Sequence, residues 1–156
     1  MKERIDLFDG HCDTVFLSCL KGGSLRKNTG HVDLERGSAY RRYAQFFALF
    51  GQPEDFPNRS MAEIFETELR LFQRELAANE DLAVHCRTSL EAQAAFDAGK
   101  CAVFLSVEGA ELLDCSLERL REAHRLGVRA VNLTWNRSNA LSGSNVEGPE
   151  AGLTAQ

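Results

Sequence analysis

The stretch Cys101-Ala-Val-Phe-Leu-Ser-Val107 decides the fold of this chain, because it is a nearly continuous apolar run. A run without polar alternation is typical of a β-strand that is covered on both faces, as in parallel sheets flanked by helices. Glu108 follows the run directly, and Gly109 comes next. The stretch therefore predicts a buried strand with a carboxylate at its C-terminal end.

Strand and helix patterns alternate on both sides of this run. Strand patterns cover residues 4–9, 43–50, 82–85 and 128–134, and helical patterns cover residues 60–79, 89–99 and 116–127. Ser60 and Glu63 form a capping box, and Gly99 and Gly127 are natural helix stops. We expect residues 21–38 to form a long connection. This alternation predicts an α/β fold with a parallel sheet.

The choice between a doubly wound sheet and a barrel depends on the first loop. A doubly wound nucleotide-binding sheet carries a G-x-G-x-x-G loop after its first strand, and no such loop follows residues 4–9. The Gly/Ser/Asn-rich tail, residues 138–156, contains no closing element. We therefore expect residues 1–156 to form a single domain that is an incomplete β/α barrel.

Composition excludes several classes of protein. The chain has 156 residues, 18 basic and 23 acidic side chains and a net charge of −5, with no basic stripe for nucleic acid. No apolar run reaches the roughly 20 residues that span a bilayer. Met1–Asp6 lacks the apolar stretch of a signal peptide, so we expect a cytoplasmic protein. The five cysteines have no C-x-x-C spacing, which argues against a zinc finger or a disulfide framework.

The segment Asp9-Gly10-His11-Cys12-Asp13 is the strongest chemical signal. Side chains at i and i+2 of an extended chain share a face, so Asp9, His11 and Asp13 are expected to project together. An imidazole beside a carboxylate at the C-terminal end of a parallel strand makes half of a zinc site. The alternative is an aspartate that caps a turn beside a half-buried histidine.

Two further positions lie at strand ends. Glu108 can meet His11 and Asp13 inside a barrel, because a carboxylate at a buried strand end needs a partner or a metal; the alternative is a solvated loop glutamate, as we expect for Glu111. Trp135, the only tryptophan, can line a substrate pocket with Asn136 as a hydrogen-bonding neighbour, or it can be a core aromatic. His31, His85 and His124 fit structural roles, His85 as a core histidine.

Taken in order, these segments resemble the membrane (renal) dipeptidase family of binuclear zinc peptidases, including its bacterial members. The matching motifs are Asp9-Gly10-His11-Cys12-Asp13, His31-Val32-Asp33-Leu34, Gln45-Phe46-Phe47-Ala48, Ser106-Val107-Glu108-Gly109, Leu133-Thr134-Trp135-Asn136 and Gly152-Leu153-Thr154. The resemblance is collinear and covers essentially the whole chain.

The resemblance implies the N-terminal half of a (β/α)₈ barrel, of the metal-dependent hydrolase type. His11 and Asp13 would bind one Zn²⁺, and Glu108 would bridge two and serve as the catalytic carboxylate. In the family, the bridging water or hydroxide attacks the peptide carbonyl of a dipeptide. Asp9 would give at most indirect support to the ligands.

Two departures from the family matter. Trp135 stands where the mammalian enzymes have a substrate-contacting histidine. Family members also continue for about as long again, and that second half supplies the histidines of the second zinc. We therefore expect at most a partial zinc site and an activity that needs the C-terminal half. Two alternatives stay open: a non-catalytic half-barrel that associates with itself or a partner through its open edges, and another metal-dependent amidohydrolase.

Overall fold

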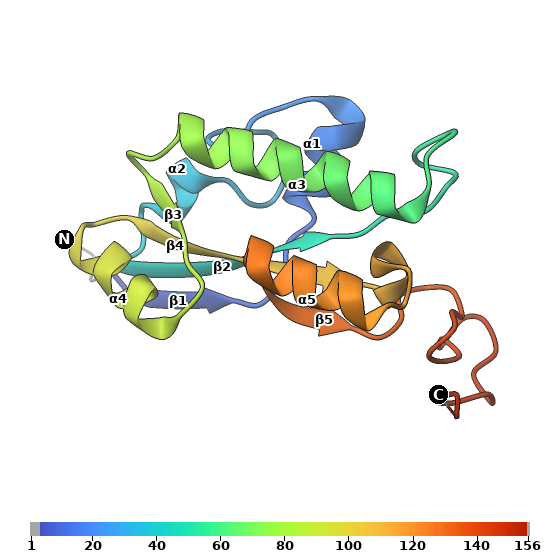
Figure 1. Cartoon of the computed structure of the whole chain (residues 1–156). Helices are drawn as coiled ribbons and strands as arrows, with labels where there is room; N and C mark the ends of the chain where they lie inside the picture. Colours follow the sequence, from blue (N-terminus) through green and yellow to red (C-terminus); the bar gives the residue numbers. More distant parts are fainter. Residues whose placement is uncertain (1–3, 156) are drawn as a thin grey trace.

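A computed structural model describes residues 4–155 and shows a five-stranded parallel sheet with helices on both faces (Figure 1). The strands are β1 (Asp6–Asp9), β2 (Arg42–Leu49), β3 (Ala83–His85), β4 (Cys101–Glu108) and β5 (Val128–Asn132). The helices are α1 (Thr14–Lys21), α2 (Leu34–Gly37), α3 (Met61–Ala78), α4 (Ser89–Asp97) and α5 (Leu117–Leu126), with a 3₁₀ turn, η1 (Ala110–Leu113). The predicted α/β class is confirmed. The first three residues of the Met1–Asp6 stretch lie outside the described residues.

Strand β4 is the centre of the sheet. Strand β2 pairs along one edge of β4, from Ala102 to Val107. The other edge is shared, because β3 pairs with residues 101–103 and β5 pairs with residues 105–108. Strand β1 pairs with the far edge of β2. The strands β1, β2, β4 and β5 therefore follow one another in chain order, and β3 is a short addition beside the start of β4.

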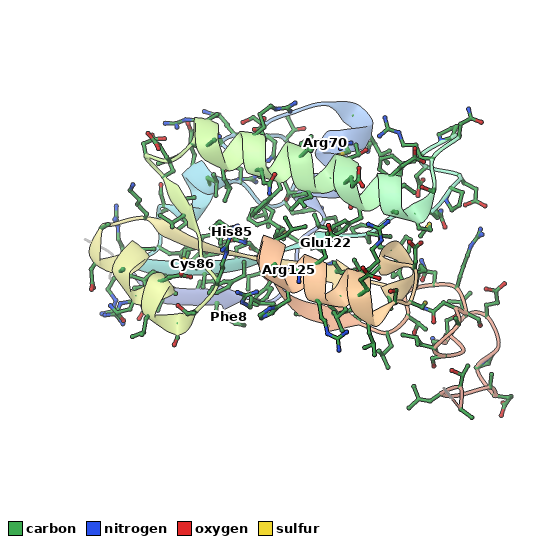
Figure 2. All side chains as sticks on the ribbon, in the orientation of Figure 1. Phe8, Arg70, His85, Cys86, Glu122 and Arg125 are labelled. Atoms are coloured by element: carbon green, nitrogen blue, oxygen red, sulfur yellow. The ribbon has the colours of Figure 1, made fainter. Side chains whose placement is uncertain are left out.

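The two faces of the sheet bury different side chains. Odd-numbered residues of β2 and β4, such as Phe47 and Leu105, join α1, α3 and α5 in the main core. On the other face, Ala44 and Ala102 are small, and α4 packs against them. Farther along this second face Phe46 stacks on Phe104 with ring centroids 5.0 Å apart. Phe8 lies on the same side, away from α3, and is 67% exposed (Figure 2).

Most predicted element boundaries are confirmed, and the misses have local reasons. The Ser60–Glu63 capping box is present, and Gly127 ends α5 with φ 108°. Helices α1 and α2 were not predicted. The N-cap residue of α1 makes no side-chain capping bond, and α2 is only four residues long, so neither leaves a strong pattern.

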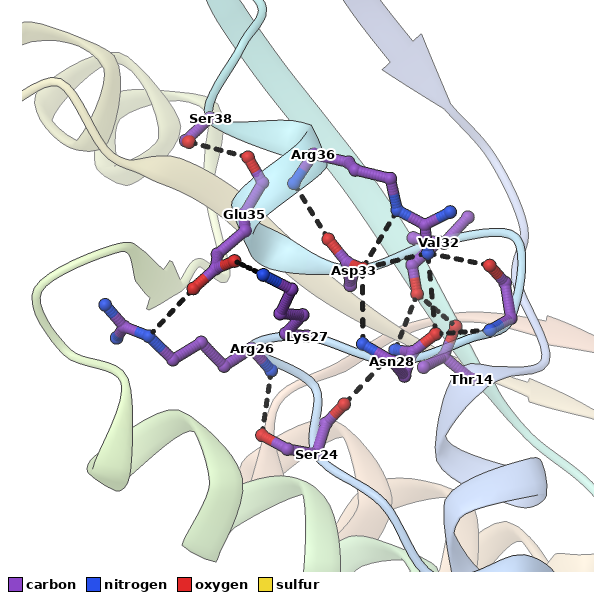
Figure 3. A network of polar contacts seen from close by, with 11 residues as sticks. Thr14, Ser24, Arg26, Lys27, Asn28, Val32, Asp33, Glu35, Arg36 and Ser38 are labelled. Atoms are coloured by element: carbon purple, nitrogen blue, oxygen red, sulfur yellow. Dashed lines mark hydrogen bonds and ion pairs between the residues drawn. The ribbon is translucent and has the colours of Figure 1, made fainter.

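Helix α2 interrupts the expected connection of residues 21–38, which a polar network orders (Figure 3). Asp33 is buried and accepts hydrogen bonds from the Arg36 backbone N–H at 2.8 Å and from Arg36 Nε at 2.9 Å. The Asn28 backbone N–H donates to the same carboxylate at 3.3 Å. These bonds lower the pKa of Asp33 against the effect of its burial. The connection is therefore a fixed part of the fold.

Glu68 is the exception in the core. It lies on α3 with no exposed surface, and within residues 4–155 neither carboxyl oxygen has a hydrogen-bond partner. Burial raises the pKa of Glu68 well above its usual value. The Phe50 backbone N–H faces the carboxyl outside hydrogen-bonding geometry and only partly offsets this rise.

We expect the Glu68→Gln variant to gain stability over the wild type as the pH rises. The folded chain holds the Glu68 proton more tightly than the unfolded chain, so the wild type loses stability from the ordinary carboxyl pKa upward. Denaturant unfolding at pH 5 and pH 8 measures the difference. Glu66→Gln, an exposed change on the same helix, is the control and should show no such trend. A Glu68→Gln difference that is equal at both pH values would contradict a raised pKa.

Candidate active site

The candidate site forms where β1 and β4 end. Both strands are parallel to β2, so their C-terminal ends lie at one edge of the sheet. Residues 10–13 follow β1, and the backbone N–H of Ala48 on β2 donates to the carbonyl of Cys12 at 3.1 Å. Glu108 is the last residue of β4. The loop after β1 is therefore held against β2 beside Glu108.

Two of the predicted metal ligands, Asp13 and Glu108, approach the ring nitrogen Nε2 of the third, His11. His11 Nε2 lies 2.9 Å from Asp13 Oδ1 and 3.6 Å from Glu108 Oε2. The side chains of His11 and Asp13 are about half exposed, at 49% and 53%, whereas that of Glu108 is 22% exposed. The site thus opens to solvent on the β1 side and is closed on the β4 side.

The three side chains are of types that bind zinc, although they do not form a complete cage. The 2.9 Å contact between His11 Nε2 and Asp13 Oδ1 is a direct hydrogen bond, and Glu108 Oε2 lies farther from the same nitrogen, at 3.6 Å. Imidazole nitrogen and carboxylate oxygen are both zinc ligands. Residues 4–155 contain no ready-made group of three or more His, Cys, Asp or Glu side chains around a common point.

The electrostatics of Glu108 also favour a cation. Burial raises the pKa of Glu108 above its usual value, the charge of Asp13 raises it further, and His11 opposes both effects. Ionising this carboxyl beside Asp13 is therefore unfavourable unless positive charge is present. A divalent ion between the two carboxylates would remove that penalty.

Asp9 does not join the three ligands, contrary to the expectation from extended spacing. Strand β1 ends at Asp9, and Asp9 Oδ1 accepts a hydrogen bond from the backbone N–H of His11 at 3.2 Å. Asp9 therefore stabilises the loop of residues 10–13 that carries His11.

An aromatic cluster lies beside His11. The Phe50 ring stacks on Phe16 at 4.3 Å and meets Trp135 edge-on at 4.9 Å, and its centroid is 6.5 Å from that of the His11 ring. Trp135 is half-buried, while Asn136 is exposed and accepts at its carbonyl from Ser144 Oγ at 2.8 Å. The sequence analysis placed Phe50 in the predicted strand of residues 43–50 and did not assign it to the site. The position of Phe50, directly after β2, is the signal that could have placed it at the site.

The remaining polar candidates lie elsewhere. His85 is half-buried next to Phe72, with Nε2 3.3 Å from the Gly127 carbonyl, and burial lowers its pKa, which confirms the core interpretation. His31 and His124 are exposed. Glu111 is not a free loop glutamate, because its Oε2 accepts from Asn139 Nδ2 at 2.7 Å.

In the part of the chain that the structure describes, no helix is both long and apolar enough to cross a membrane.

Comparisons with known proteins identify relatives. The family model described as membrane dipeptidase (peptidase family M19) matches residues 1–156. The chain is 32% identical over 118 residues to the dipeptidase tcpJ of Claviceps purpurea, covering 70% of this chain and 28% of the relative. It is 34% identical over 143 residues to an uncharacterized dipeptidase of Schizosaccharomyces pombe, covering 81% of this chain and 34% of the relative.

Solved structures show the same fold. The chain matches dipeptidase AC, a metallopeptidase of family M19, with a TM-score of 0.71 and 24% identity, over 90% of this chain and 46% of that one. It matches a Rhodobacter sphaeroides metallopeptidase, bound to a phosphinate mimic of L-Ala-D-Ala, with a TM-score of 0.72 and 20% identity, over 93% of this chain and 49% of that one.

The share of the relatives' length that the chain covers agrees with a half-barrel fold. The chain spans about a third of the length of these curated relatives and about half of these solved structures. The predicted half-barrel is thus confirmed at the level of the fold. With the family model matching from end to end, this chain belongs to the membrane dipeptidase family.

Proposed function

We propose that this chain forms one half of a zinc dipeptidase that hydrolyses the peptide bond of dipeptides. The observation that carries the proposal is the approach of Asp13 and Glu108 to His11 Nε2, in a chain of the dipeptidase family. His11, Asp13 and Glu108 would hold zinc, through one imidazole nitrogen and two carboxylates. Family membership supports the substrate class.

The ligand count limits what residues 4–155 can do. They offer one imidazole and two carboxylates at the site, while His31, His85 and His124 lie elsewhere. We therefore propose a partial site, with at most one zinc ion per chain, in an incomplete domain of residues 1–156. Full activity would need ligands from the other half of the barrel.

The chain's own residues have distinct parts in the proposed reaction. When bound, zinc polarises a carbonyl and lowers the pKa of a water molecule. Glu108, the most buried of the three ligands, would be the catalytic carboxylate and supply negative charge at the site. Trp135, packed on the buried Phe50, would form an apolar wall beside the substrate. The Trp135 indole can donate one hydrogen bond and cannot transfer a proton, and Asn136 would be its hydrogen-bonding neighbour.

Zinc binding is the first test. We expect the purified chain to retain at most one zinc ion after dialysis, because the Asp13 and Glu108 carboxylates both approach His11 Nε2. His11→Ala and Glu108→Ala should weaken binding by about tenfold or more, since loss of even an indirect ligand partner has effects of that size. Elemental analysis and calorimetric titration measure content and affinity. His31→Ala, which removes an exposed histidine away from the site, is the matched control.

Two outcomes would count against the zinc assignment. Equal zinc content in the wild type, His11→Ala and Glu108→Ala would remove these residues from the site. Two tightly bound zinc ions per monomeric chain would show that the ligand count is incomplete.

Glu108→Gln should have opposite effects with and without metal. Since burial and Asp13 raise the pKa of Glu108, the folded state binds its proton more tightly, and the metal-free wild type loses stability as the pH rises above the ordinary glutamate value. We therefore expect metal-free Glu108→Gln to be more stable than the wild type at pH 8. Added zinc should reverse the order. Denaturant unfolding with EDTA or with zinc provides the measurement, and an unchanged order would argue against a metal at Glu108.

Trp135 allows substrate binding to be followed directly, because it is the only tryptophan of the chain. We expect a dipeptide such as L-Ala-D-Ala to change the Trp135 emission of the zinc-loaded chain and to leave the zinc-free chain unaffected. Hydrolysis should be slow and abolished by chelation, given the partial site. Trp135 emission that stays unchanged at all dipeptide concentrations, or hydrolysis that does not depend on zinc, would reject the assignment of Trp135 to a zinc-dependent substrate site.

Association through open edges is a second candidate role. Within the described residues, β1 and β5 each have an outer edge without a neighbouring strand, and Phe8 and Leu133 are exposed nearby at 67% and 48%. Unpaired strand edges favour association. Light scattering measures the molar mass in solution, and a monomer at micromolar concentration would exclude stable self-association.

A further inference from the structure

We propose that Gln45 is a positioning residue for the loop that carries His11 and Asp13, and that it acts through the backbone of Asp9. The inference rests on the proposed function, since it concerns how the zinc ligands are held. Gln45 itself touches none of the three ligands by any hydrogen bond found in residues 4–155.

Gln45 is an unusual residue for its place in the fold. It lies in the middle of β2 with no exposed surface, on the face that Phe47 and Leu49 share with the main core. A buried amide is unfavourable unless its hydrogen-bonding groups are satisfied. Here, Nε2 donates to the Phe46 carbonyl at 2.8 Å and to the Asp9 carbonyl at 3.4 Å, and Oε1 accepts from the Tyr43 hydroxyl.

The partners fix the orientation of the amide. The carbonyls of Asp9 and Phe46 can only accept, so the NH₂ group must face them. The remaining oxygen then faces the Tyr43 hydroxyl, which must donate. Tyr43 is itself 6% exposed, so the pair forms a satisfied polar network inside an apolar core. A network of this kind specifies one geometry.

The hydrogen bonds of Gln45 connect it to His11 through Asp9. Asp9 is the last residue of β1 and lies opposite Gln45 in the parallel register. Its carbonyl is held by Gln45, and its Oδ1 accepts from the His11 backbone N–H at 3.2 Å. One residue later, Cys12 accepts from Ala48 on β2 at 3.1 Å. The backbone on both sides of His11 is thus tied to β2, at Asp9 by the Gln45 side chain and at Cys12 by the Ala48 backbone.

A purely structural role predicts a different outcome from a positioning role. Replacing both members of a buried hydrogen-bonded pair by apolar groups of similar shape can be nearly neutral for stability. The double variant Tyr43→Phe/Gln45→Met should therefore fold. If Gln45 only fills the core, zinc binding should survive in this variant; if Gln45 positions Asp9, zinc binding should weaken although the fold is retained.

The experiment compares zinc affinity with unfolding stability in four proteins. These are the wild type, Gln45→Met, the double variant, and Phe72→Leu as a core control on α3, away from β1. We expect Gln45→Met and the double variant to bind zinc about tenfold more weakly, in the range seen for indirect ligand support. Phe72→Leu should lose stability and keep its zinc affinity.

Amide hydrogen exchange gives a readout that needs no metal. The His11 N–H should exchange faster in Gln45→Met and at the wild-type rate in Phe72→Leu. The proposal is overturned if Gln45→Met keeps both the wild-type zinc affinity and the wild-type exchange rate of the His11 N–H. It is also overturned if Phe72→Leu loses zinc affinity in the same proportion to its loss of stability as Gln45→Met does. If the wild type binds no zinc, the proposed function fails, and the exchange rates alone still decide whether Gln45 holds the loop.

Discussion

The parallel pairing of β2 with β4 is the constraint on which the rest of this structure depends. The pairing runs from Ala44 to Leu49 on β2, and it leaves the other edge of β4 for β3 and β5. Because all strands point the same way, the residues that follow them gather at one edge of the sheet. His11, Glu108 and Phe50 are neighbours for this reason, although they are far apart along the chain. The chemistry of the candidate site thus follows from the direction of the strands.

Much of the fold could be predicted because its strongest elements carry strong local patterns. Strand β4 is nearly uninterrupted by polar residues, and α3 begins with a complete capping box at Ser60. Helix α1 was not predicted, although the residue before it, Asp13, is of a type that often caps helices. The Asp13 carboxylate makes no capping bond and faces His11 instead, at 2.9 Å. The local pattern and the side-chain contacts of Asp13 therefore point in different directions.

The residues of the candidate site also divide into those that the sequence could identify and those that it could not. His11, Asp13 and Glu108 could be singled out, because polar residues at the ends of apolar strands have few structural uses. Gln45 could not, since it lies in an apolar strand pattern and only three-dimensional contacts reveal its neighbours. Phe50 was placed inside the predicted strand of residues 43–50, although it follows β2 directly. Asp9 was misjudged because the spacing rule does not account for a local hydrogen bond, and its carboxylate accepts from the His11 backbone N–H. Sequence patterns find groups that can do chemistry more readily than the groups that hold them.

The incomplete ligand set and the open sheet have a common origin in the architecture. A β/α barrel draws its site residues from the ends of several strands, so each strand contributes only a few ligands. The ends of β1 and β4 bring one imidazole and two carboxylates together, in a chain that spans about half of its solved relatives. The same arrangement leaves Phe8 exposed on the face opposite α3. In the proposed complete barrel, strands beyond β1 or β5 would both add ligands to the site and cover this face.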